Sequence, residues 1–163
     1  ATLIAEQDAA CVDRYWEQLS SLLASPYSYQ RACAVNVLVP IACRRKSGDE
    51  TAELVRALES TFPSESTVNA RYILHGLGRI AVSVHEFRGS ITEFLLRAVT
   101  ADSPNSALLR SDVIDAFSDY AQLLPDRERV IAYVRQQLHS SSPRTRKSAR
   151  EFLKKFAAAS AGS

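Results

Sequence analysis

Three aspartates in one helical stretch are the residues whose type and spacing best suit binding chemistry. Asp112, Asp115 and Asp119 follow one another at intervals of three and four, so an α-helix projects them from one face. Hard cations need oxygen ligands that converge from loops, which a single helical row does not supply. We therefore interpret the row as an acidic ridge that either binds a basic peptide or pairs with Arg79 or with basic residues of the next repeat along the chain. We expect no metal there.

Motifs for catalysis are weak elsewhere in the chain. There are three histidines and one His-Glu pair, His85-Glu86, which is too few ligands for a di-iron site. No Ser/His/Asp, Cys/His or glycine-rich phosphate motif stands out. Cys11, Cys33 and Cys43 include no CxxC pair, so thiols in a reducing compartment are the simplest interpretation. We expect a non-enzymatic protein without a cofactor.

A basic run near the C-terminus is the strongest charge feature. Six cations fall within 12 residues and are opposed only by Glu151: Arg144, Arg146, Lys147, Arg150, Lys154 and Lys155. Phosphate backbones attract such clusters without sequence preference. No aromatic residue interleaves with the run for base stacking. A solvated capping helix is the interpretation we favour, and nucleic-acid contact is the alternative.

Composition sets wider bounds. With 163 residues the chain has the size of one domain, and its formal net charge of +2 is too mild to imply nucleic acid by itself. No apolar run approaches the roughly 18 residues that span a bilayer. The first residues, ATLIAEQD, lack the basic-then-apolar order of a signal peptide. We expect a cytoplasmic protein with no membrane partner.

The elements that must position these residues repeat along the chain. Four stretches align without gaps when each ends on an alanine, and the alanines lie 39, 40 and 36 residues apart: Ala42, Ala81, Ala121 and Ala157. Self-similarity at this period is typical of a helical repeat array. The pattern predicts eight helices, at 7–24, 27–45, 50–61, 66–83, 90–101, 105–123, 126–139 and 143–159. They form four pairs of a shorter and a longer helix within one domain, over 7–45, 50–84, 88–124 and 126–160.

The same alignment sorts the longer helices into packing columns and exposed rows. Three columns are apolar at a helical spacing and predict the core: Val35, Leu74 and Ile114; Leu38, Leu77, Phe117 and Leu153; Ile41, Ile80, Tyr120 and Phe156. The alanine column marks where helix backbones approach closely. The other rows predict a shared partner-binding surface: Asn36, Tyr72, His75, Arg79, Asp112, Asp115 and Asp119. We expect Tyr27 and Tyr29, at the first turn, to pack over helix ends.

Two features of the longer helices carry a resemblance to a known family. Ser-Pro precedes three of them, at 25–26, 103–104 and 142–143, and a basic residue lies near the start, at Arg31, Arg110 and Arg146. The chain resembles the HEAT-repeat, armadillo-like α-solenoid family over nearly its whole length. Ala70 departs from that pattern. The resemblance implies an all-α fold, a right-handed solenoid of about four HEAT-like helix pairs whose longer helices line a concave surface.

Function follows from the resemblance as an expectation. It implies a binding or scaffold module that docks a protein or peptide on the concave surface. The alternative is a nucleic-acid-binding HEAT-like protein that uses the basic C-terminal helix, including the DNA-repair glycosylases of this fold. Those enzymes set a carboxylate among aromatic residues. Asp112 and Asp115 are the candidate carboxylates here, without aromatic partners beside them.

Overall fold

The chain is all-α within the residues that its computed structural model describes, which are 15–45, 48–100 and 104–161, without the side chains of Pro104 and 157–161. The α-helices are α3 (Trp16–Ser21), α4 (Ser28–Arg45), α5 (Asp49–Thr61), α6 (Thr67–Ser83), α7 (Arg88–Arg97), α8 (Pro104–Asp119), α9 (Arg127–Gln136) and α10 (Pro143–Ala161). This confirms the all-α part of the predicted fold. No helix among these residues is both long enough and apolar enough to cross a bilayer.

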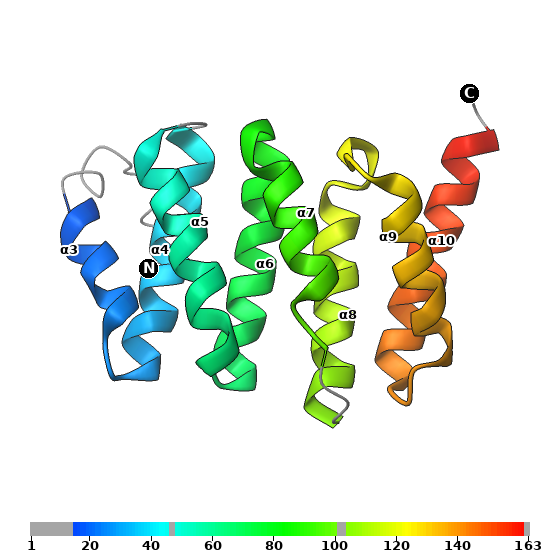
Figure 1. The fold of residues 1–163 in the computed structure, drawn as a ribbon, viewed down its shortest axis with the longest axis horizontal. Coiled ribbons are helices and arrows are strands. Elements are labelled where there is room, and N and C mark those ends of the chain that lie inside the picture. The colour runs from blue at the N-terminus through cyan, green and yellow to red at the C-terminus, as the bar shows by residue number, and fades with distance from the viewer. Residues whose placement is uncertain (1–14, 46–47, 101–103, 162–163) are drawn as a thin grey trace.

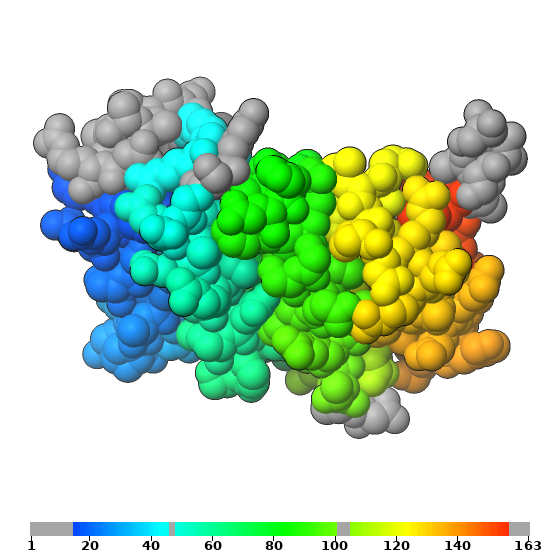
Figure 2. Space-filling model, turned by 45° about the horizontal axis from the view of Figure 1, so that its top comes forward, coloured from blue at the N-terminus to red at the C-terminus, as the bar shows by residue number. Residues whose placement is uncertain are grey.

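The helices form two layers along the long axis of the molecule. The long helices α4, α6, α8 and α10 pack side by side in chain order, and the shorter α3, α5, α7 and α9 lie over them (Figure 1). Successive segments abut one another as one continuous body (Figure 2). We call the side of the long helices that is turned away from the short ones the long-helix face. Neighbouring long helices are therefore placed to share any site on this face.

The core lies between the two layers, where the predicted columns place it. All three columns are buried except for Leu153, which is partly exposed. The expected alanine contact is only part of the packing. Ala42 and Ala81 are fully buried, but Ala121 lies beyond the end of α8, and the side chain of Ala157 is outside the described residues. A Cβ at Gly78 would lie 3.0 Å from the Ala116 Cβ, so the α6 and α8 backbones approach closely there.

Helix ends follow local sequence signals. The Ser66 hydroxyl caps α6 by accepting a hydrogen bond from the Asn69 N–H, and the Ser142 hydroxyl accepts one from the Thr145 N–H at the start of α10. Gly48 adopts a φ of 118° between α4 and α5, a conformation that favours glycine. These residues thus mark where α5, α6 and α10 begin.

Several helix boundaries differ from the sequence prediction. The segment predicted at 90–101 is helical over Arg88–Arg97, and the one predicted at 126–139 ends as an α-helix at Gln136. The segment predicted at 105–123 is helical only to Asp119, and Ala121–Leu123 forms a 3₁₀ turn. Tyr120 leaves the helical conformation, and its hydroxyl lies 3.0 Å from that of the buried Thr92, so the turn is held against α7. The predicted first helix, 7–24, begins outside the described residues, and within them α3 starts at Trp16.

Candidate functional site

Asp112 is buried and surrounded by cations from two neighbouring helices. Its side chain is 0% exposed. The Arg71 Nε of α6 donates to Asp112 Oδ2 at 2.8 Å, and the Arg144 Nη2 of α10 donates to Oδ1 at 3.0 Å. His75 Nε2, also on α6, lies 3.2 Å from Oδ1. One carboxylate of α8 thus links three long helices.

This burial corrects the prediction of an exposed acidic ridge. A carboxylate leaves water only when charged or hydrogen-bonded partners replace the water, and Arg71, His75 and Arg144 do so here. The alternative that the row pairs with basic residues of the next repeat is confirmed for Asp112 by its bond to Arg144, whereas Arg71 and His75 belong to the preceding repeat. Asp115 remains half-buried and lies 3.5 Å from Arg144 Nη2, whereas Asp119 is exposed. The partner-binding row on α8 therefore reduces to Asp115 and Asp119.

The ionisation of this cluster follows from its contacts. Burial is the largest influence on Asp112 and would raise its pKa, but hydrogen bonds from His75 and Arg71 together hold that pKa below its ordinary value. The bond to Asp112 raises the pKa of His75, against the opposing effect of burial. With both oxygens engaged by cations, Asp112 is a weak base. It is therefore poorly suited to act as a catalytic carboxylate.

An apolar patch lies on the long-helix face, at the starts of α4 and α6. It comprises Tyr29, Cys33, Val68 and Tyr72, all of them exposed, and the Tyr29 side chain is 66% exposed. Positions 29 and 68, and likewise 33 and 72, are separated by the same 39 residues as Ala42 and Ala81. Because α4 and α6 pack side by side, equivalent positions lie next to each other. We infer from this spacing that the four side chains share one surface.

Sequence reasoning placed only Tyr72 of this apolar patch at the site. The expectation that Tyr27 and Tyr29 pack over helix ends is wrong, because they are 63% and 66% exposed. Val68, at 62% exposed, was not singled out. The signal was present in the alignment, where Tyr29 and Val68 share a column one helical turn before Cys33 and Tyr72. An exposed column that stays apolar in two successive helices indicates a contact surface.

Of the other residues predicted for the partner-binding surface, one makes a contact within its own helix and two line a hollow. Asn36 is half-buried and donates to the Ala32 carbonyl one turn earlier, at 2.9 Å. Arg79 and Asp119 help to line a hollow of about 460 Å³ at the other end of the long-helix face, together with Cys43, Val82 and Ser83. Burial raises the pKa of the Cys43 thiol, which makes it a poor nucleophile. Among the described residues, no three His, Cys, Asp or Glu side chains could hold a metal ion.

The basic residues of α10 also divide into two groups. Arg144 is engaged with Asp112, and Arg146 Nη1 donates to the Ser140 and Ser141 carbonyls at 2.7 and 3.0 Å. Arg31 holds the equivalent turn before α4, where its Nη1 donates to the Ser25 carbonyl at 2.6 Å. The remaining four are exposed: Lys147, Arg150, Lys154 and Lys155. The repeated arginine thus has a structural role in the turn between short and long helices.

Comparison with protein-family models, with curated proteins and with solved structures gives no match for this chain. Its own residues are therefore the basis for assigning a function.

Proposed function

We propose that the chain is a right-handed HEAT-like α-solenoid of four helix pairs, and that its long-helix face binds a protein or peptide partner without catalysis. The packing supports this architecture. The long helices pack on one another in succession, whereas the short helices pack mainly on the long ones. Closer spacing on one side of a stack curves it toward that side, so the long-helix face is the concave one in this proposal.

The observation that carries the binding role is the apolar patch. Monomeric soluble proteins seldom leave adjacent large apolar side chains in water unless the surface makes a contact. Tyr29 and Tyr72 suit such a contact because tyrosine buries a large ring while its hydroxyl stays hydrogen-bonded. Arg79, Asp115 and Asp119 supply charged groups farther along the same face, which fits the polar rim of an interface. The partner would therefore present apolar side chains to α4 and α6.

Site-specific photocrosslinking tests this proposal in the cells that express the chain naturally. A photoreactive phenylalanine at position 72 should give a discrete crosslinked product, which mass spectrometry then identifies. Arg135, exposed on the short helix α9, is the matched position and should give no such product. Val68→Glu should remove the product formed from position 72, because it places a charge in the apolar patch. Equal labelling from both positions would contradict the proposal.

A second candidate is nucleic-acid binding through α10. The exposed side chains of Lys147, Arg150, Lys154 and Lys155 favour it. Fluorescence anisotropy with a labelled duplex, repeated across salt concentrations, is the test. Each phosphate contact adds about −0.9 to the slope of log K against log salt on duplex DNA. Lys154→Glu should flatten that slope. Absence of binding at low salt would remove this candidate.

The described cysteines bear on location. Cys33 and Cys43 are both free thiols. Free thiols fit a reducing compartment, so a cytoplasmic location forms part of the proposal.

A further inference from the structure

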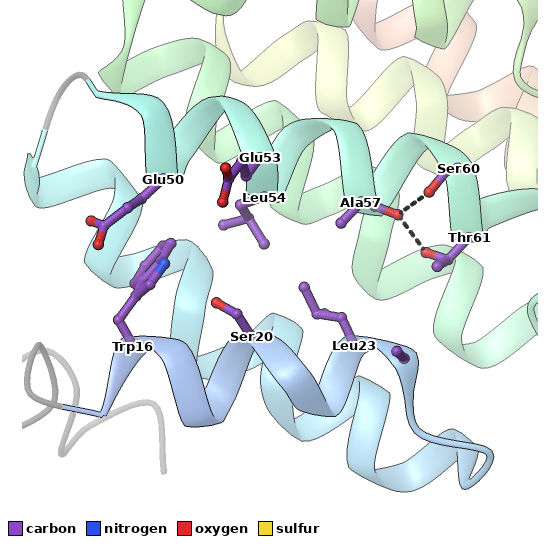
Figure 3. Close-up of a pocket in the computed structure, with 10 residues that line it drawn as sticks. Trp16, Ser20, Leu23, Glu50, Glu53, Leu54, Ala57, Ser60 and Thr61 are labelled. Carbon is purple, nitrogen blue, oxygen red and sulfur yellow. Dashed lines mark hydrogen bonds between the residues drawn. The ribbon is translucent and has the colours of Figure 1, made fainter.

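A groove of about 340 Å³ separates α3 from α5 on the short-helix side of the molecule (Figure 3). Its floor is apolar and well packed, since Trp16, Leu23 and Leu54 are only 5%, 8% and 2% exposed. This volume falls within the range of small-molecule pockets, which are typically apolar with a few polar groups that orient the ligand. The groove lies on the opposite side of the long helices from the apolar patch, so it is a separate site.

Small side chains create the groove. Ser20 of α3, Ala24 of the 3₁₀ turn that follows α3 and Ala57 of α5 line it, together with the larger Trp16 and Leu23. Figure 3 shows Ser20 of α3 and Leu23 of the following 3₁₀ turn directed toward α5, and Leu54 and Ala57 lying opposite them. Larger apolar residues at these positions would bring the two short helices into contact through their side chains. The space therefore follows from residue size.

The polar groups of the groove are unevenly placed. Glu50 and Glu53 lie on α5 at the end near Trp16, and Ser20 faces Glu53 across the groove (Figure 3). At the other end, the Ser60 and Thr61 hydroxyls already donate to the Ala57 carbonyl, at 3.0 and 2.9 Å. A ligand therefore meets carboxylates at one end and mainly apolar surface beyond them.

Arg45 already occupies the end of the groove at Glu50 and Trp16. Its guanidinium pairs with Glu50, and its central carbon lies 4.5 Å from the centre of the Trp16 ring. A cation between a carboxylate and an indole face gains from both the opposite charge and the ring quadrupole. Glu53 has no ion pair with any residue that the structure describes. One carboxylate at the groove is thus neutralised by the chain itself, and the other is left for a ligand.

We propose that the groove between α3 and α5 binds an amphiphilic organic cation. Its charged head lies at Glu53 across from Ser20, and its apolar tail lies along Leu23 and Leu54. The carboxylate selects the sign of the head, and the apolar floor removes the tail from water. The site requires no contribution from the long-helix face, so its occupancy is independent of the function proposed above.

The only tryptophan of the chain, Trp16, lies in the groove and reports binding directly. Octylammonium is the probe, titrated below its micellar concentration while tryptophan emission is followed. Octanol and octanoate have the same tail length with a neutral and an anionic head. Octylammonium should give a saturable change, octanol should bind about five-fold more weakly, and octanoate should not saturate. Equal affinity for octanoate would overturn the proposal, as would equal affinity for octanol, which would indicate an apolar void only.

Two variants and a control locate the binding. Glu53→Gln should weaken octylammonium binding about five-fold and leave octanol binding unchanged, since an exposed ion pair contributes at most about that factor. Glu128→Gln, which alters an exposed carboxylate on the short helix α9, should change neither. Ala57→Leu fills the groove and should abolish the response to both ligands. Far-UV circular dichroism checks that each variant stays folded. An unchanged dissociation constant in either Glu53→Gln or Ala57→Leu would overturn the proposal.

Discussion

The Arg144 guanidinium donates to the Asp112 carboxylate at 3.0 Å, which joins the last long helix, α10, to its neighbour α8 across 32 residues of chain. Arg71 approaches the same carboxylate from α6, at 2.8 Å. Asp112 is completely buried, so these bonds replace all of its contact with water. A single charged residue thus links three of the long helices.

Asp112→Asn should lower the free energy of unfolding by about 2–3 kcal/mol, because it removes the charge while two arginines remain in place. We expect a smaller loss of stability than for a fully buried ion pair, because Arg71 and Arg144 are 36% and 44% exposed and can turn toward water. Asp115→Asn is the matched control and should cost under about 1 kcal/mol. Urea unfolding measures both. Equal losses would show that the buried carboxylate adds no particular stability.

Stability should contain a contribution from His75 that disappears as the pH rises. Its pKa is raised in the folded chain, so this contribution is complete below the unfolded value of 6.5 and is lost as the pH passes through the folded pKa. The carboxylates facing it are Asp112, Asp115 and Asp119, and Arg71 and Arg144 bind the same Asp112 carboxylate. His75→Gln should therefore cost more stability at pH 5.5 than at pH 8.5, as urea midpoints will show. The exposed His139→Gln is the comparison.

The opposite dependence is expected for Asp112. Its pKa is depressed on folding, so its contribution is present above the ordinary aspartate value of 3.8 and is lost as the pH falls through the folded pKa. Acid unfolding of Asp112→Asn should accordingly be shallower than that of the parent chain. Identical acid transitions would exclude a protonation step at this residue.

Two glycines should respond in opposite ways to alanine. Gly78→Ala places a Cβ 3.0 Å from the Ala116 Cβ and 3.1 Å from its Cα, where backbone must move, and should cost about 1–3 kcal/mol. Gly89→Ala meets nothing within 4 Å inside α7 and should stabilise the chain by about 0.4–1 kcal/mol. Thermal or urea unfolding compares them directly. A loss of stability at Gly89 would contradict the open space around it.

The apolar patch should be nearly neutral for folding. Replacing Tyr29 and Tyr72 together by serine should change stability by less than about 0.5 kcal/mol, the usual range for exposed positions. Phe117→Ala, in the core column beneath the long-helix face, should cost about 3–5 kcal/mol. Chemical denaturation separates the two cases. A large loss for the tyrosine pair would mean that these side chains support the fold and would weaken their assignment to binding.

The fold was largely predictable because its determinants are local and periodic. Leu38, Leu77 and Phe117 recur at a helical spacing, and Ser66 and Ser142 mark the helix starts at which they cap. Tyr120 shows the limit of this reasoning. The end of α8 depends on a contact between its hydroxyl and Thr92, 28 residues away, which no local pattern contains.

The site was less predictable because burial depends on distant partners. Asp112 and Asp115 have the same type and lie three residues apart, but the helix rotation buries only one of them. The cations of Asp112 come from positions 41 and 32 residues away. The groove at Ala57 could not be predicted from the sequence for a related reason. It depends on what small side chains leave unfilled between two helices, and a single sequence gives no measure of that space.

The bonds that Arg71 and Arg144 make to Asp112 have a consequence for the order in which the molecule unfolds. Stacked helix arrays commonly lose their terminal pairs first, since each unit touches only its neighbours. Detaching α10 here would remove Arg144 from a carboxylate that α6 and α8 keep away from water. Local unfolding of the C-terminal helix therefore leaves the buried Asp112 carboxylate, in the middle of the chain, with one cation fewer. The last three long helices should thus open together, as one cooperative unit.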